Sequence, residues 1–144
     1  MAIKVKEGFP LIGRSEFVIE KTVSEDLLRT LCRIAITANE KLANSADNLL
    51  RAMDNGRFDT ARIFESFMDE ESGYLENAAG EINVQQQILL FFIYNSIKPS
   101  LVVNARKLSN LLSSIDERLT ILCPVCGSMP GFATLEGEGE KYVF

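Results

Sequence analysis

The sequence lacks several features on which common functions depend. It has no histidine and only three cysteines among its 144 residues. We find no nucleophile–base pair and no phosphate-binding glycine loop, so the sequence offers no residues for ordinary enzymatic catalysis. Two of the three cysteines have the spacing of metal ligands rather than of a disulfide framework. This usage predicts a reducing compartment and a protein that is not an enzyme.

Concentrated charge and long apolar runs are also absent. The 15 basic and 20 acidic residues give a net charge of −5 and form no long block, whereas nonspecific nucleic-acid binding needs a concentrated basic face. Residues 1–8 lack the apolar core of a signal peptide. The longest apolar run, over residues 88–93, is too short to span a bilayer. The sequence therefore predicts a soluble cytoplasmic protein that binds neither nucleic acid nor membrane.

What is present suffices for a helical core. Hydrophobic residues make up 47% of the chain and charged residues 24%, close to the averages of globular proteins. From residue 22 onward, apolar residues recur at steps of three and four, the period of an amphipathic helix. We expect a mainly α fold, a helical bundle over residues 1–118 with an irregular arm over residues 1–21.

Capping residues and helix breakers predict where the first helices begin and end. Thr22, with Glu25 three residues later, has the pattern of a capping box. Gly56 ends the helical pattern, because glycine favours the left-handed conformation that follows a helix. A single helix over residues 23–54, or two helices with a break near residues 44–45, would satisfy the pattern.

The second half of the helical region holds the most apolar segment. Asp59 caps a shorter helix, and residues 74–80 predict one or two loose helical turns. Asn83 begins a helix in which residues 88–93 are apolar all round, as expected of a central helix surrounded by others. A hydrophobic surface for a client protein is the alternative. Pro99 ends this helix or kinks it into the next.

Two smaller patterns could carry chemistry but have simpler explanations. Cys32 lies on the apolar face of the first helix, where a thiol is more often a small buried hydrophobe than a ligand. Asp69, Glu70 and Glu71 are consecutive carboxylates at a helix end. Because consecutive helical side chains point in different directions, a solvated helix end is favoured over a cation site.

The strongest motif is the sequence Cys-Pro-Val-Cys-Gly over residues 123–127. In a Cys-x-x-Cys-Gly turn both sulfurs point at one ion, and the turn is the usual half of a four-thiolate metal site. Pro124 sets φ inside the turn, and Gly127 allows the chain to fold back beneath the metal. Cys123 and Cys126 are therefore the candidate ligands of a zinc or iron ion, which needs four.

The residues around this metal knuckle predict a small β module. Residues 119–122 are apolar and β-prone, residues 131–135 and 141–144 have strand patterns, and residues 136–140 form a turn between them. A strand, a knuckle and a hairpin in this order begin a zinc ribbon or rubredoxin-like unit. We expect the first part of such a metal-binding ribbon over residues 119–144.

This segment, Cys-Pro-Val-Cys-Gly-Ser-Met-Pro followed by a strand and Gly-Glu-Gly-Glu-Lys-Tyr, resembles the formate dehydrogenase accessory protein family (FdhE). The match covers residues 122–142, and the helical region is compatible with the family. The resemblance implies a cytoplasmic, non-enzymatic assembly factor with a helical domain and rubredoxin-like modules. It also implies contact with the catalytic subunit of formate dehydrogenase, a molybdenum or tungsten enzyme. Only the first knuckle carries over, as Cys123 and Cys126, and the later cysteine pairs of the family are missing.

The incomplete metal site leaves several interpretations open. The chain could be truncated within the hairpin, which its last residues favour, or be a natural minimal homologue. Alternatively, two chains could clasp one ion in a homodimer, with four thiolates at about 2.3 Å from zinc. A thiol–disulfide oxidoreductase with Cys123 as nucleophile is a further alternative. That chemistry uses a helix N-terminus after the pair, whereas Gly127 and Pro130 follow here.

Overall fold

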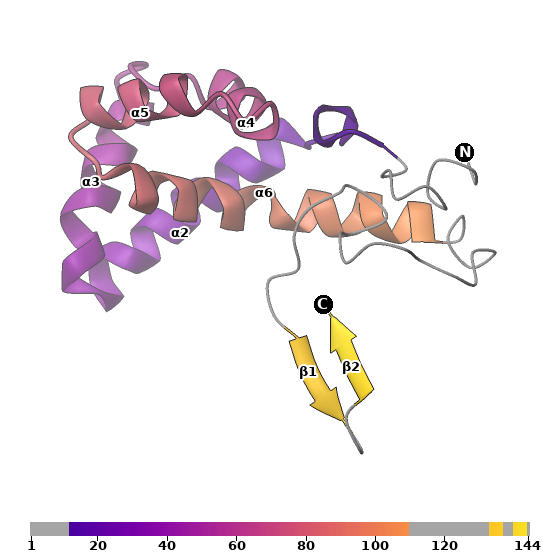
Figure 1. Ribbon diagram of the computed structural model, residues 1–144. Helices are drawn as coiled ribbons and strands as arrows, with labels where there is room; N and C mark the ends of the chain where they lie inside the picture. The colour runs from indigo at the N-terminus through magenta and orange to yellow at the C-terminus, as the bar shows by residue number, and fades with distance from the viewer. Residues whose placement is uncertain (1–11, 110–132, 137–139, 144) are drawn as a thin grey trace. The chain divides into compact units, whose positions relative to one another are not determined.

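A computed structural model describes residues 12–109, 133–136 and 140–143 of the chain (Figure 1). These residues form a short 3-10 helix, five α-helices and two strands. The mainly α fold class is thus confirmed for the described part of the chain. Residues Val18–Val103 form one compact unit.

Asn39 divides the first helical stretch into α2 (Lys21–Ala38) and α3 (Glu40–Asp54). Its backbone is extended, with φ −146° and ψ 104°, and its side-chain oxygen accepts a hydrogen bond from the Lys41 amide at 3.0 Å. An asparagine N-cap of this kind ends one helix and begins the next without leaving the first amides unpaired. A break was predicted, but near residues 44–45 rather than at residue 39.

The predicted capping box at the start of α2 is wrong. The helix begins at Lys21, so Thr22 lies inside its first turn, and its N-cap residue makes no side-chain cap hydrogen bond. The Glu25 carboxylate instead accepts hydrogen bonds from Arg29 and Thr60. Thr60 is 35 positions away in the chain, so a tertiary partner has replaced the local one.

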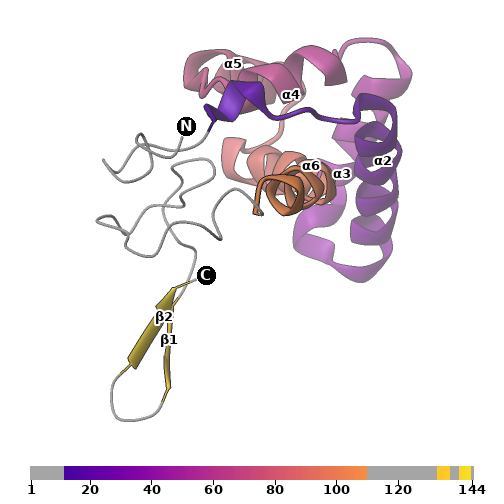
Figure 2. The ribbon, with the colours of Figure 1, turned by 90° about the vertical axis from the view of Figure 1, so that its right-hand side faces the viewer.

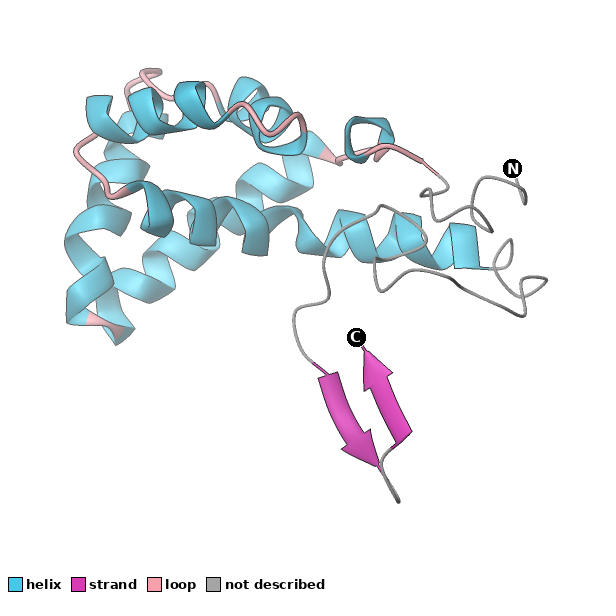
Figure 3. Ribbon diagram, in the orientation of Figure 1, coloured by secondary structure: helices cyan, strands magenta, loops and turns pink. Residues whose placement is uncertain are grey.

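The predicted ends of the next two helices are largely confirmed. Gly56 adopts φ 67° just after α3, and the Asp59 carboxylate accepts a hydrogen bond from a backbone amide in the first turn of α4 (Thr60–Met68) at 3.0 Å. The loose turns predicted over residues 74–80 form a regular helix, α5 (Ser72–Glu81). The loops between these helices are short (Figure 3).

Helix α6 (Gln86–Ser109) is the central helix of the bundle. Figures 1 and 2 show it running beside α2 and α3 on one side and beside α4 and α5 on another. It begins at Gln86 and not at Asn83, which adopts a left-handed φ of 54° in the preceding turn. Pro99 lies inside α6 and does not end it.

The core of the Val18–Val103 unit draws on all five helices. Its largest fully buried apolar side chains lie on α2, α3, α4 and α6 and are Leu28, Cys32, Leu49, Ile63, Phe64, Leu89, Phe92, Ile93 and Ile97. Helix α5 adds Leu75 and Ala79, which are 4% and 2% exposed. Four core residues thus come from α6, which explains why the other helices are arranged around it.

The two described strands form an antiparallel pair. Strand β1 (Ala133–Glu136) pairs with β2 (Glu140–Val143) so that residue 133 lies opposite residue 143 (Figure 3). The knuckle that should precede them lies outside the described residues. The metal-binding ribbon over residues 119–144 and the domain boundary at residue 118 therefore remain predictions.

Candidate functional site

The predicted metal ligands, Cys123 and Cys126, lie outside the described residues. Residues 12–109 and the two short strands contain no group of three or more histidine, cysteine or acidic side chains that could hold a metal ion. In the sequence the knuckle supplies two thiolates, which is half of the donor set that zinc takes in a structural site. The zinc or iron site therefore remains a prediction.

Cys32 is a buried hydrophobe, as predicted. Its side chain is 0% exposed in α2, and it is a free thiol. Burial raises the pKa of this thiol from 9.0 to about 12, although the positive charge of Arg29 acts in the opposite direction. Because the thiolate is the form that ligates metals and attacks electrophiles, the burial of Cys32 and its raised pKa both disfavour these roles.

The three consecutive carboxylates after α4 do not form a cation site. Asp69 and Glu70 are exposed, and the backbone of Glu70 is left-handed with φ 59°. Glu71 binds the Arg62 guanidinium at 2.6 Å, and this guanidinium also lies 5.0 Å from the centre of the Tyr74 ring. These carboxylates thus lie at a solvent-facing helix end, where Glu71 pairs with Arg62 of α4.

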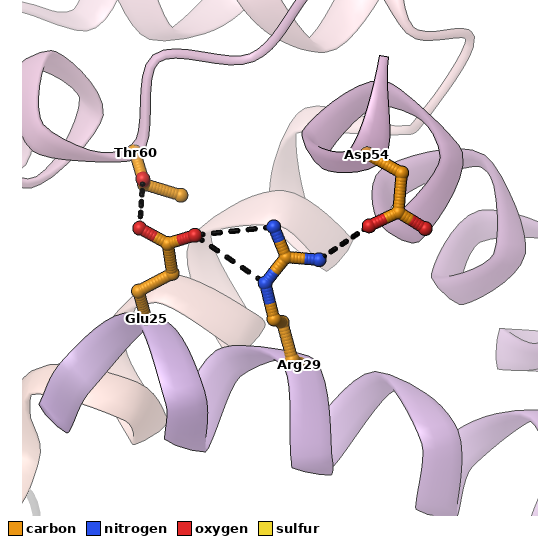
Figure 4. A network of polar contacts seen from close by, with 4 residues as sticks. All are labelled: Glu25, Arg29, Asp54 and Thr60. Carbon is orange, nitrogen blue, oxygen red and sulfur yellow. Dashed lines mark hydrogen bonds and ion pairs between the residues drawn. The ribbon is translucent and has the colours of Figure 1, made fainter. Parts of the chain in front are cut away.

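A polar network joins α2 to the end of α3 and the start of α4 (Figure 4). Arg29 donates two hydrogen bonds to Glu25 Oε1, at 3.1 and 3.3 Å, and one to Asp54 Oδ1 at 2.6 Å. The Thr60 hydroxyl donates to the other Glu25 oxygen at 2.8 Å. Because these groups bind one another across three helices, we interpret the network as a structural connection and not as a catalytic one.

One face of α6 presents apolar and aromatic side chains to solvent. Phe91, Tyr94 and Val102 are 52%, 44% and 38% exposed, and the Lys98 ammonium lies 5.9 Å from the centre of the Tyr94 ring. These four residues stand at positions i, i+3, i+7 and i+11, which share one face of a helix. We call them the α6 stripe. They extend over three turns, about 16 Å at 1.5 Å per residue.

The α6 stripe points away from the core. The fully buried Leu89 and Ile93 lie on the opposite side of α6 from Phe91, by the helical period of 3.6 residues. Figure 2 looks nearly along α6 and shows the other described helices on two of its sides, while none of them covers the remaining side. Among the described helices, none encloses this side of α6, so the prediction of a helix surrounded on all sides does not hold for the part of the chain that the structure describes.

Helix α6 is also long and apolar enough, over Gln86–Leu108, to cross a membrane by length and composition alone. The sequence prediction considered only the run over residues 88–93 and missed that the apolar character continues. The core helix of a soluble protein passes the same test. In this bundle one face of α6 is buried, with Phe92, Ser96 and Ile97 each no more than 1% exposed.

A signal for the exposed stripe was present in the sequence. The three polar positions Gln87, Asn95 and Lys98 lie within about 40° of Phe91 on a helical wheel with 100° per residue. Polar residues that gather on one side of an apolar helix indicate the side that faces water. The run over residues 88–93 is too short to display this pattern, which needs the full length of α6.

No family model, curated protein or solved structure matches this chain. The fold and the stripe define the class of protein as a mainly helical bundle that exposes an aromatic face of its central helix.

Proposed function

We propose that this chain is a non-enzymatic accessory factor that binds a client protein through the α6 stripe. The observation that carries this proposal is that the central helix of the bundle presents two aromatic rings to solvent, Phe91 and Tyr94. Aromatic side chains are enriched at protein interfaces, and contiguous apolar patches mark interaction sites. The client is the catalytic subunit of formate dehydrogenase, the partner implied by the resemblance of residues 122–142.

The chemistry of the described residues supports a binding role. The Cys32 thiol is buried with its pKa raised to about 12, and Glu25, Arg29 and Asp54 bind one another. Cys32, Glu25 and Arg29 are the buried or half-buried ionisable side chains of α2, and each is either protonated and buried or engaged in this network. The α6 stripe instead offers surface area and one positive charge, which suit recognition.

The knuckle of Cys123 and Cys126 completes the proposal as one half of a zinc or iron site. Metal binding by such a turn contributes to folding, because the ligands of a small ribbon are brought together only when the metal binds. Its role in this proposal is structural. The second half of the donor set comes from a further cysteine pair or from the knuckle of a second chain in a homodimer.

Co-purification with the catalytic subunit of formate dehydrogenase tests the docking function. We expect Phe91→Ser together with Tyr94→Ser to reduce co-purification and formate dehydrogenase activity at least about tenfold, because aromatic anchors dominate interface energies. Ile34→Ser is the matched control, since Ile34 is an exposed apolar residue on α2 at 55% exposure. Normal enzyme maturation with the double variant, at unchanged helical content, would refute the proposal.

The metal half of the proposal has a separate test. Cys123→Ser together with Cys126→Ser should abolish zinc or iron binding, measured as moles of metal per chain by mass spectrometry. A ratio of one metal per two chains supports the homodimer. An unchanged metal content in the double variant would exclude these cysteines as ligands.

A further inference from the structure

The exposed face of α6 differs in charge from the rest of the chain. Acidic residues outnumber basic ones by 20 to 15 in the whole sequence, but α6 contains no aspartate or glutamate. Lys98 lies within the stripe, with its ammonium 5.9 Å from the centre of the Tyr94 ring. A cation held over a ring is attracted by the negative face of that ring, while the apolar stem of the lysine covers neighbouring apolar surface. The stripe therefore combines apolar area with one positive charge.

We infer that the α6 stripe binds an amphipathic α-helix of a partner protein that places a carboxylate beside Lys98. Apolar side chains of that helix contact Phe91, Tyr94 and Val102. This inference rests on the proposed docking function and adds to it the class of segment that is bound.

The stripe fits a helix better than an extended segment. A strand binds by adding its backbone hydrogen bonds to a sheet edge, whereas the backbone groups inside α6 are already paired along the helix. Side chains three and four residues apart form ridges that pack into the grooves of another helix. The three-turn stripe matches a partner helix with apolar residues at the same spacing over about 16 Å.

The charge of the stripe selects an acidic partner. When a helix covers Tyr94, the neighbouring Lys98 ammonium loses part of its hydration, and this loss is offset only if an opposite charge is supplied. No acidic residue of α6 can supply it. A carboxylate on the partner is thus favoured, and a second cation at the same place is disfavoured.

Two other occupants fit the stripe less well. Attraction to an anionic membrane needs several lysines or arginines close together. The stripe has one, with the polar Gln87 and Asn95 beside it, and the two other cations of α6, Arg106 and Lys107, lie in its last turn beyond the stripe. A two-fold pairing with a second copy of the chain would bring both Lys98 side chains into one interface, with no carboxylate on either α6. An acidic helix from a different protein avoids both difficulties.

Two synthetic helical peptides of three turns each test this inference. They share one set of leucine anchors and one tryptophan, and they differ in carrying glutamates or lysines beside the anchors. The chain itself has no tryptophan, so the fluorescence reports the peptide alone. We expect the glutamate peptide to bind about fivefold more tightly than the lysine peptide, the upper range for an exposed ion pair. Lys98→Glu should reverse this preference, and Ile34→Ser should leave it unchanged.

The possible outcomes separate this inference from the docking function. Three results with the peptides would overturn the inference. They are equal binding of the two peptides, no binding of either at millimolar concentration, and a preference for the lysine peptide. Tighter binding to phosphatidylglycerol than to phosphatidylcholine vesicles, or a dimer that Phe91→Ser dissociates, would also overturn it. In each of these cases the co-purification test with formate dehydrogenase still decides the docking function on its own.

Discussion

Cys32 differs from the other two cysteines in that its position on α2 determines its chemistry. The helical period places it on the same face as the buried Leu28 and Ala35, where it is 0% exposed. Sequence periodicity sufficed to predict this, because the neighbours that bury Cys32 follow the same period. The metal-ligand role predicted for Cys123 and Cys126 depends instead on further ligands, and both residues lie outside the described part of the chain.

We expect Cys32 to resist alkylation by iodoacetamide in the native protein at about pH 8, because its pKa of about 12 leaves almost no thiolate. The same thiol should react readily in urea, where burial is lost. Mass spectrometry of the labelled peptides distinguishes Cys32 from the other two cysteines. Equal labelling rates in buffer and in urea would show that the thiol is accessible in the folded chain.

The raised pKa of Cys32 also predicts a dependence of stability on pH. The folded state favours the protonated thiol, so its contribution is fully present below pH 9.0 and is lost as the pH rises toward 12. The free energy of unfolding of the native sequence should therefore fall relative to that of Cys32→Ala across this window. If the free energies of unfolding of the two proteins changed equally with pH, the raised pKa of Cys32 would be contradicted.

Arg29→Met should lower the free energy of unfolding by about 1–2 kcal/mol, because it leaves Glu25 and Asp54 without their shared cation. Both carboxylates are partly exposed, which limits the loss. Arg51→Met is the matched control, since Arg51 is 73% exposed in an i,i+4 pair with Asp47, and its effect should stay within about 0.5 kcal/mol. Urea denaturation measures the free energy of unfolding of both variants. Equal losses for Arg29→Met and Arg51→Met would show that the network adds no more stability than an exposed ion pair.

At the scale of elements, the helix caps that depend on neighbouring residues were predictable from the sequence. Those that tertiary contacts change were not. Asp59 and Gly56 act on residues within one turn of themselves, and both have the predicted role. Thr22 lost its predicted role because Glu25 binds Arg29 and Thr60 instead. The break between α2 and α3 was placed near residues 44–45 rather than at Asn39, because the apolar pattern continues through residue 39.

Asn39→Ala should destabilise the bundle by about 1 kcal/mol, the usual cost of removing an N-cap side chain. The Asn39 oxygen accepts from the Lys41 amide at 3.0 Å, and this bond is lost with alanine. Asn39→Asp keeps an acceptor at the same place and should retain the stability, as judged by urea denaturation. If Asn39→Ala left the free energy of unfolding unchanged, solvent would satisfy the first amides of α3 equally well.

At the scale of the whole molecule, the mainly α class followed from composition and period, but the surface of α6 did not. Whether a given side of a helix is covered depends on which other helices pack there, and a short run such as residues 88–93 carries no information about them. Phe91 and Leu89 are equally apolar in the sequence, yet they are 52% and 0% exposed. The metal site stays a prediction that rests on two cysteines, Cys123 and Cys126, outside the described residues.

A fragment of residues 18–103 should fold by itself, because it is one compact unit with its own core. We expect a helical circular dichroism spectrum and one cooperative urea transition. A fragment of residues 18–85 lacks Leu89, Phe92, Ile93 and Ile97, all 1% exposed or less, and should not fold. Cooperative unfolding of the shorter fragment would show that α6 is dispensable for the core.

The order of the helices has a consequence for synthesis on the ribosome. Helices α2 to α5 leave the exit tunnel before α6, although α6 supplies four of the core side chains. Until about residue 97 has emerged, the apolar faces of the earlier helices have no central helix to pack on. We expect the nascent chain to expose these apolar faces until the last turns of the bundle have left the exit tunnel, well after they have been translated.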